Sequence, residues 1–256
     1  MLKSSSLEDP PRLHWNKILP LDRGSVQTLA PAIEETLKQA DLRVCDLEFL
    51  SVTVGPGSFT GLRVGLATAK MLAMAGGKPI VPVDTLAAVA RRFAASQCPT
   101  PGQSLRLVTA INAYRKQLFT ASWFIDSSGL WNVRPSSVVD LQAWLDNPWG
   151  AETPTRRPST PVSDEQVASK EQLASDKQLA SKVWISGAAL EIYPLPSERE
   201  SHFRAATADV WQPLAEDVGV LAWEGYRKGT AVSAAHLLPN YIRSSAAEEK
   251  RKSLAR

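Results

Sequence analysis

Hydrophobic positions near the beginning of the chain recur at helical spacing. From residue 25 onward, apolar side chains return every three or four positions: Val26, Leu29, Ile33 and Leu37. Charged residues occupy the other side of this wheel, so the spacing predicts an amphipathic helix with Ser25 as its N-cap. Pro31 falls inside this segment and should kink the helix or mark a shorter first turn.

The following segments change from helical spacing to nearly continuous apolar runs. Residues 47–54 and 78–83 are rich in β-branched side chains, which is typical of strands covered on both faces. Segments of helical spacing, 60–75 and 86–95, follow them. This alternation of strand and helix predicts an α/β fold in which the strands pair in parallel.

The second half of the chain predicts further strands and helices. We expect strands at 105–111, 117–125 and 183–186, with a hairpin-type turn at 127–129 and a glycine turn at Gly187. Helices are expected at 138–146 and 209–228, and residues 239–243 form an extended closing segment. A strand is also expected at 13–19, near the beginning of the chain.

The chain of 256 residues is long enough for one large or two small domains. We expect a disordered lead-in at 1–12 and two subdomains at 13–99 and 100–208. A helix and closing segment then occupy 209–243, and a polar tail occupies 244–256. Residues 150–182 contain the repeat EQVASK, EQLASD, KQLASK, whose polar composition predicts a low-complexity insertion in the second subdomain.

Charge and cysteine content exclude only a few classes of function. The formal net charge of +3, from 29 basic and 26 acidic residues, is too balanced to indicate a nucleic-acid binder. Cys45 and Cys98 form no CxxC pair, so neither a metal site nor a redox motif is predicted. Because no apolar run is long enough to span a membrane and the N-terminus does not resemble a secretory signal, we expect a cytoplasmic protein without membrane contact.

The stretch VTVGPGSFTGLRVGLATAK, residues 52–70, is the most distinctive part of the sequence. Its glycine turn suggests three roles: a phosphate cradle, a support for a catalytic group, or a place where another backbone comes close. The lysine of a Walker loop is absent, and the GxGxxxG spacing is one residue longer than the dinucleotide pattern. Residues of this turn and the following helix are therefore candidates for a partner interface or a nucleotide loop: Gly55, Pro56, Gly57, Ser58, Phe59, Thr60, Gly61, Arg63 and Gly65.

Catalytic arrangements are scarce in the sequence. His14, His202 and His236 are not spaced as metal-binding pairs, and Ser58 does not stand in the GxSxG pattern of a nucleophile. Asp84 and Asp126 stand at a helix start and a turn, where capping explains them. The residues therefore predict no catalytic group and no metal site in this chain.

Several segments in order resemble the bacterial TsaB (YeaZ) family. The glycine stretch matches the family signature, residues 25–37 resemble its first helix, and the segment at 82–86 resembles its "GV(S/D)TL" junction. Residues 111–115 resemble its "iDArrgevy" turn, and residues 239–249 resemble its ending. Together these matches cover most of residues 13–249, apart from the insertion.

The resemblance implies an α/β fold of the ASKHA (actin-like, Hsp70-like) type, duplicated and with its first sheet truncated at the N-terminus. It also implies a non-catalytic scaffold in the synthesis of threonylcarbamoyladenosine on tRNA. The implied partners are a catalytic TsaD-like paralogue and a TsaE-like ATPase, with indirect contact to tRNA and with ATP and a metal bound by the partner subunits. Helices 25–39 and 60–75 would form the interface through Val26, Leu29, Ile33, Leu62, Leu66, Ala69 and Ala73.

The sequence also departs from this family and leaves alternatives open. The family's first strand, its turn and its second strand have no match in this sequence, so we expect either a misassigned start or a truncated first sheet. Asn112 stands where the family has Asp. A homodimer through the same two helices is an alternative to the heterodimer, and Arg63 suits either tRNA or a partner carboxylate. An active nucleotide-dependent transferase or kinase of the same fold is the alternative function, whereas no nucleophile–base pair supports a peptidase.

Overall fold

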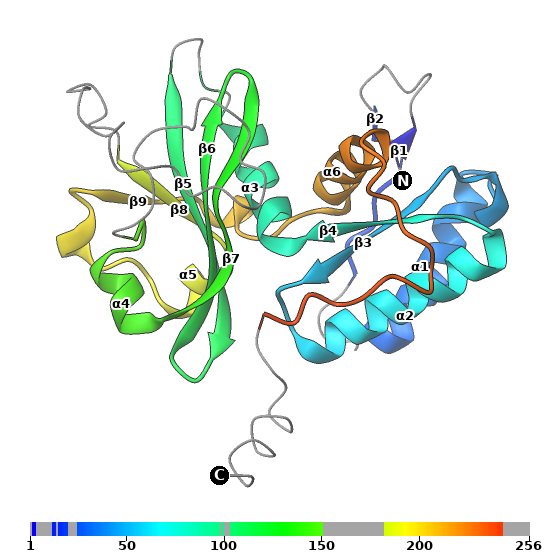
Figure 1. Cartoon of the computed structure of the whole chain (residues 1–256), viewed down its shortest axis with the longest axis horizontal. Coiled ribbons are helices and arrows are strands. Elements are labelled where there is room, and N and C mark those ends of the chain that lie inside the picture. Colours follow the sequence, from blue (N-terminus) through cyan, green and yellow to red (C-terminus); the bar gives the residue numbers. More distant parts are fainter. Residues whose placement is uncertain are drawn as a thin grey trace, which may run out of the picture. The chain divides into compact units, whose positions relative to one another are not determined.

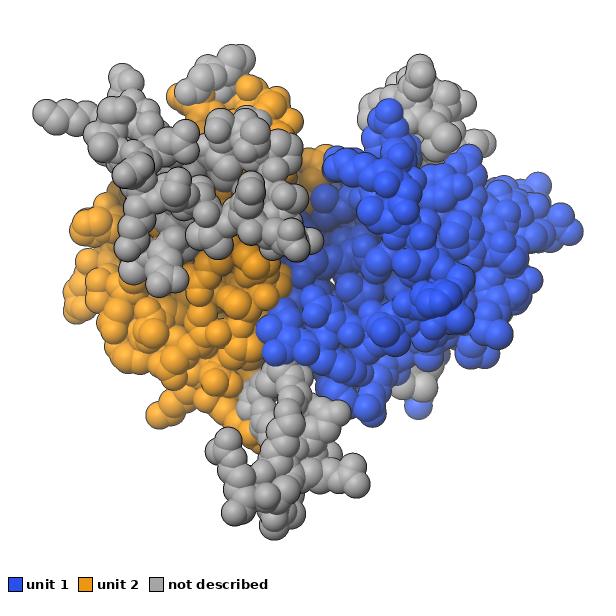
Figure 2. Space-filling model, viewed as in Figure 1, with its two compact units in different colours: residues 1–88, 213–256 blue, residues 89–212 orange. Residues whose placement is uncertain are grey.

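A computed structural model of the chain describes residues 2–3, 12–13, 15–19, 25–97, 99, 103–150 and 182–242. The chain forms two compact units, which Figure 2 shows in different colours. Unit 1 contains residues 1–88 and 213–256, and unit 2 contains residues 89–212. The predicted tail at 244–256 and nearly all of the predicted insertion at 150–182 lie outside the described residues.

Unit 1 contains the segment around the glycine motif (Figure 1). Its elements are β1 (Leu2–Lys3), β2 (Arg12–Leu13), α1 (Ser25–Gln39), the 3-10 helix η1 (Val44–Asp46), β3 (Leu50–Gly55), α2 (Phe59–Gly76), β4 (Ile80–Asp84), the start of α3 (Thr85–Ser96) and α6 (Ala215–Arg227). Strands β3 and β4 pair in parallel, with Leu50 opposite Ile80. The predicted parallel α/β arrangement of this part of the chain is therefore confirmed.

Local chemistry explains where these elements begin and end. Helix α2 begins after Ser58, whose Oγ accepts a hydrogen bond from Gly61 N at 3.4 Å, and it ends at Gly77 in the left-handed conformation. Helix α3 is capped by Asp84, whose Oδ1 accepts from Ala87 N at 2.9 Å. The capping role predicted for Asp84 is therefore confirmed. Helix α1 begins at Ser25 and continues through Pro31. The side chain of Ser25, the predicted N-cap, lies outside the described residues, so its capping role stays a prediction.

Helices cover both faces of the β3–β4 sheet. Side chains alternate along a strand, so Leu50, Val52 and Val54 face one side and pack with α2 and the buried Leu237. The other side packs with α6, where Phe49 stacks on Tyr226 with ring centroids 4.6 Å apart. The outer edge of β4 pairs with Val232 at one antiparallel bridge, between Ile80 and Val232.

Three predictions for this unit are wrong in part. The lead-in contains β1, which pairs antiparallel with β2, and residues 15–19 lie outside regular secondary structure although a strand was expected at 13–19. Residues 208–210 form the 3-10 helix η4 (Ala208–Val210), and α6 begins at Ala215, later than the predicted helix start at 209. The reason is Pro213, which has no N–H and disfavours a helical conformation of the residue before it.

Unit 2 is built on a mixed five-stranded sheet with the order β7-β6-β5-β8-β9 (Figure 1). Its elements are β5 (Ser104–Tyr114), β6 (Gln117–Asp126), β7 (Gly129–Asp140), α4 (Leu141–Asp146), β8 (Val183–Ser186), α5 (Ala189–Ile192), the 3-10 helix η3 (Ser197–Arg199), β9 (Phe203–Ala205) and η4. Strands β5, β6 and β7 form an antiparallel meander, whereas β8 pairs in parallel with β5 and β9. The predicted strands and the hairpin turn at 127–129 are confirmed, but the predicted helix at 138–146 begins only at Leu141.

One buried pair of polar side chains joins β5 to β6 in this sheet. Trp123 Nε1 donates to Thr109 Oγ1 at 2.9 Å, and both residues are buried. We expect Thr109→Val to leave the indole N–H without an acceptor and to lower the free energy of unfolding by about 1–3 kcal/mol. Urea unfolding measures this change. Thr207→Val, at an exposed position, is the control and should change stability by less than about 0.5 kcal/mol.

Candidate functional site

The glycine turn brings the closing segment against the end of β3. Gly55 is buried and has φ of +121°, and a Cβ at this position would lie 2.8 Å from the carbonyl oxygen of Asn240. Asn240 N donates to Val54 O at 2.8 Å. Close approach of another backbone, one of the three roles suggested for the turn, is therefore observed at Gly55.

The other turn residues differ in how strongly the structure constrains them. Pro56 is buried and follows Gly55 through a cis peptide bond. A Cβ on Gly57 would meet its nearest neighbour, Leu62, at 3.9 Å, an ordinary contact. Ser58 caps α2, and both Thr60 and Gly61 are exposed. A nucleotide-loop role for these residues stays a prediction.

An exposed cluster joins the start of α2 to the closing segment. The ring of Phe59 stacks on that of Tyr241 with centroids 4.9 Å apart, and the guanidinium carbon of Arg63 lies 3.9 Å from the Phe59 centroid. Arg63 Nε also donates to Tyr241 Oη at 3.5 Å. This cluster positions Arg63 on the exposed surface. The sequence predicted an extended closing segment at 239–243 but did not identify Tyr241 as part of the site.

The predicted partner interface is wrong for four residues of α2, because their side chains are buried. Four candidates lie 2–9% exposed in the core of unit 1: Leu62, Leu66, Ala69 and Ala73. They pack against β3 and β4, so their side chains are not available to a partner, and a bulky residue at Ala69 would overpack the core. Helical periodicity identified the apolar stripe but did not distinguish a core from an interface.

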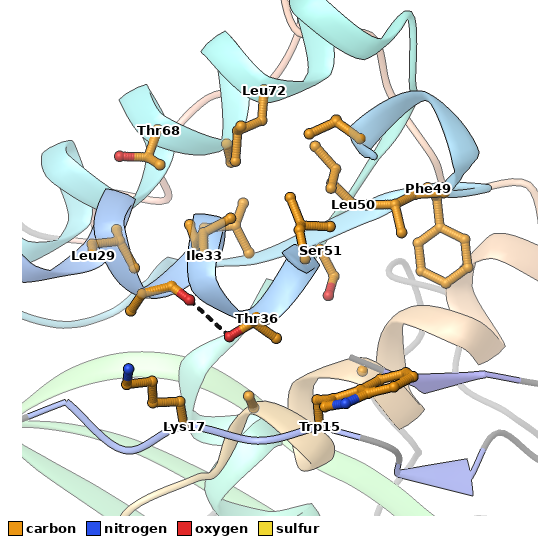
Figure 3. Close-up of a pocket in the computed structure, with 18 of the residues that line it drawn as sticks. Trp15, Lys17, Leu29, Ile33, Thr36, Phe49, Leu50, Ser51, Thr68 and Leu72 are labelled. Atoms are coloured by element: carbon orange, nitrogen blue, oxygen red, sulfur yellow. Dashed lines mark hydrogen bonds between the residues drawn. The ribbon is translucent and has the colours of Figure 1, made fainter. Parts of the chain in front are cut away.

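Three further candidates line a groove inside unit 1. Leu29 and Ile33 of α1 and Gly65 of α2 contribute to a cavity of about 700 Å³ that β3, α6 and residues 15–19 complete. Figure 3 shows Leu29 and Ile33 on the side of α1 that faces this space. We call this cavity the edge groove. The side chain of the remaining candidate, Val26, lies outside the described residues.

The exposed face of α2 carries two large apolar side chains. Met71 and Met74 are 71% and 75% exposed, and Ala67 and Arg63 are exposed on the same side of the helix. At 100° per residue this side lies opposite Gly65 and Leu72, which line the edge groove. The methionines were missed by sequence reasoning, although their spacing of three residues was a usable signal.

The described histidines and turn residues that were considered as catalytic or metal-binding candidates lie in separate parts of the chain. His202 Nδ1 pairs with Ser201 Oγ at 2.7 Å, and His236 Nδ1 pairs with Ser233 Oγ at 2.8 Å. Asp126 accepts from Ser128 N, and Asn112 accepts from Tyr114 N at 2.8 Å, so both stabilise turns. Within the described ranges, no three His, Cys, Asp or Glu side chains gather in a group suited to a metal ion, and no helix has the length and hydropathy of a membrane span.

Comparison with known proteins identifies the family. The family model described as TsaD, tRNA N6-adenosine threonylcarbamoyltransferase, matches residues 20–251. The chain belongs to the TsaD family. The chain is also similar to the tRNA threonylcarbamoyladenosine biosynthesis protein TsaB of Escherichia coli K12, which is 26% identical over 229 residues, covering 89% of this chain and 84% of that protein.

Further relatives agree with the TsaB (YeaZ) resemblance of the sequence, which is confirmed. TsaB of Bacillus subtilis 168 is 34% identical over 119 residues, covering 45% of this chain and 48% of that protein. A Pseudomonas aeruginosa crystal structure, titled as an uncharacterized protein with similarity to peptidase YeaZ, has 22% identity and a TM-score of 0.60, covering 86% of this chain and 85% of that chain. The predicted ASKHA-type α/β fold of this TsaD-family chain is likewise confirmed.

Proposed function

We propose that this chain is a non-catalytic scaffold subunit in the synthesis of threonylcarbamoyladenosine on tRNA, and that the exposed face of α2 binds its catalytic partner. Family membership supports the pathway. The partner is a TsaD-like paralogue, joined by a TsaE-like ATPase, and contact with tRNA is indirect. These subunits bind the ATP and metal that the chemistry uses, and the complex acts in the cytoplasm.

The exposed methionines of α2 are the main evidence that this face of the helix binds the partner. Large apolar side chains exposed on one helix face mark interaction sites, and Met71 and Met74 lie within one turn of each other. Methionine is unbranched and adapts its shape to a partner surface. Ala67 leaves room beside them for close approach, and Arg63 provides a charge at the end of the face.

The test is complex formation with the TsaD-like protein of the same organism. We expect the wild-type chain to form a one-to-one complex in size-exclusion chromatography with light scattering. Met71→Glu with Met74→Glu buries two unpaired charges at the contact, so affinity should fall by at least about 100-fold. Ile192→Glu in unit 2, where Ile192 is 53% exposed, is the matched control and should leave the complex intact.

Two results would contradict this proposal. Unchanged affinity of the double variant would exclude the α2 face as the contact. Saturable ATP binding by the isolated chain in titration calorimetry, with threonylcarbamoyl transfer in the absence of a TsaD-like protein, would instead favour the active transferase. Light scattering of the chain alone tests the homodimer, because a dimeric mass in the absence of the TsaD-like protein would favour it over the heterodimer.

A further inference from the structure

An exposed arginine near the start of α2 is held in position by two aromatic side chains. The guanidinium carbon of Arg63 lies 3.9 Å from the centre of the Phe59 ring, and Arg63 Nε donates to Tyr241 Oη at 3.5 Å. The two rings stack on each other with centroids 4.9 Å apart. A ring against its flat face and an acceptor at Nε together restrict how the guanidinium group can tilt and turn.

The main chain fixes the place of this cluster. Gly55 allows the close approach of Asn240, whose N–H donates to the end of β3. Tyr241 is the next residue, so this hydrogen bond determines where its ring lies. Phe59 and Arg63 are four residues apart on α2 and therefore share one face of the helix. The glycine turn and the first turns of α2 thus contribute to the same cluster.

The outer end of the guanidinium group is not used within the described part of the chain. Tyr241 accepts from Nε, and the N–H groups on Nη1 and Nη2 have no hydrogen bond or ion pair to a described residue. Helix α2 contains two basic residues, Arg63 and Lys70, and no acidic one, and no acidic residue occurs at 229–242. The two terminal nitrogens therefore form an exposed, positively charged fork, which matches the paired oxygens of a carboxylate or a phosphate.

The surroundings of Arg63 favour a carboxylate of a protein over a phosphate of RNA. Ala67, Met71 and Met74 continue the same exposed face of α2. Arginine, methionine and aromatic side chains are enriched in protein–protein interfaces, where lysine is depleted. RNA binding depends instead on several cations that neutralise a row of phosphates, and α2 has only Lys70 besides Arg63.

We propose that Arg63 forms a bidentate ion pair with an Asp or Glu side chain of the catalytic partner, and that Tyr241 is a positioning residue for it. The ion pair lies at the end of the α2 face that is nearest the glycine turn, beside the contact made by Met71 and Met74. This inference rests on the proposed function and adds the chemistry that the α2 face selects in its partner. Because the guanidinium group is already restricted in the free chain, it loses little conformational freedom on binding.

Affinity for the TsaD-like protein of the same organism, measured by titration calorimetry, tests the ion pair. Arg63→Lys retains the charge but loses the fork, so affinity should fall by at least about tenfold. The matched control is Arg204→Lys in unit 2, where an exposed arginine also stacks on an aromatic ring, 4.5 Å from the Trp184 centroid. The control should bind the partner as the wild type does, and a thermal scan verifies that both variants are folded.

An exchange of charges identifies the carboxylate of the partner. Arg63→Glu should lower affinity by at least about 100-fold, because two like charges then meet in the contact. Partner variants in which exposed Asp and Glu residues are changed to Arg, one at a time, are then combined with Arg63→Glu. One of them should raise the affinity of Arg63→Glu by at least about tenfold. If none of them raises it, the ion pair is excluded.

The positioning role of Tyr241 makes a separate prediction. Tyr241→Phe keeps the stacked ring but removes the acceptor of the Arg63 Nε hydrogen bond, so affinity should fall about three- to tenfold. In the Arg63→Lys background the same substitution should change affinity by less than about twofold, because the fork that Tyr241 positions is already lost. An equal effect in both backgrounds would show that Tyr241 acts on binding without Arg63.

Three further outcomes would overturn the ion pair. Weaker binding by Met71→Glu with Met74→Glu, together with unchanged binding by Arg63→Lys, would exclude the ion pair but retain the α2 face as the partner surface. If the wild-type chain formed no complex, the proposed function would fail and the ion pair with it. A loss of affinity for tRNA in Arg63→Lys, with unchanged affinity between the subunits, would identify a phosphate of RNA as the ligand of Arg63.

Discussion

Gly55→Ala is expected to detach the closing segment from the end of β3. The new methyl group would lie 2.8 Å from Asn240 O, and the left-handed φ of +121° is strained for alanine. Backbone strain of about 1–3 kcal/mol adds to the loss of the hydrogen bond from Asn240 N to Val54 O. We therefore expect the free energy of unfolding to fall by about 2–4 kcal/mol, measured by urea unfolding.

Gly57→Ala is the matched control for this turn. Its Cβ would meet Leu62 at an ordinary 3.9 Å and its backbone is not left-handed, so stability should change by less than about 1 kcal/mol. Hydrogen exchange should show that Gly55→Ala exposes the Asn240 amide and that Gly57→Ala does not. Equal effects of the two variants would contradict the assignment of close approach to Gly55.

Gly187→Ala, in unit 2, is expected to lower the free energy of unfolding more than Gly55→Ala does. A Cβ on Gly187 would lie 2.1 Å from Ala110 O and 2.9 Å from Ala110 N, both backbone atoms of the central strand β5, and φ is +126°. Neither atom can move without breaking the sheet, so the clash and the strain act together. We expect the variant to lose more than about 4 kcal/mol of stability and to be largely unfolded in a thermal scan.

Gly129→Ala separates the clash from the strain. Gly129 also has a left-handed φ, of +140°, but a Cβ there meets no atom within 4 Å. Its variant should therefore show the strain alone, about 1–3 kcal/mol. If Gly129→Ala and Gly187→Ala were equally destabilised, the close approach between β8 and β5 would not be the cause.

Gly55→Ala and Gly187→Ala should also affect partner binding, but for different reasons. The closing segment carries Tyr241, which stacks on Phe59 beside Arg63. Gly55→Ala should therefore free Arg63 from this cluster and alter one end of the α2 face. Gly187 lies in unit 2, so a loss of partner binding in its variant would follow from unfolding, which a thermal scan of the same sample would show.

The order and type of most elements follow from the sequence alone. The spacing of Leu29, Ile33 and Leu37 predicts α1, the β-branched run before Gly55 predicts β3, and Asp84 predicts where α3 begins. These signals are local, because capping, turn chemistry and hydrophobic period depend on neighbouring residues. The family resemblance also rests on such short ordered motifs, and the family model confirms it.

The tertiary structure decided which side of each element is used. Leu62, Leu66, Ala69 and Ala73 form an apolar stripe in the sequence, yet the stripe packs on β3 and β4, while Met71 and Met74 remain exposed. Likewise α6 is distant in sequence from β3 but joins unit 1 and covers its sheet. The spacing of apolar residues shows that a face is buried but not what buries it, since long-range packing depends on segments that the local pattern does not connect. The edge groove and the approach of Asn240 to Gly55 are results of that packing.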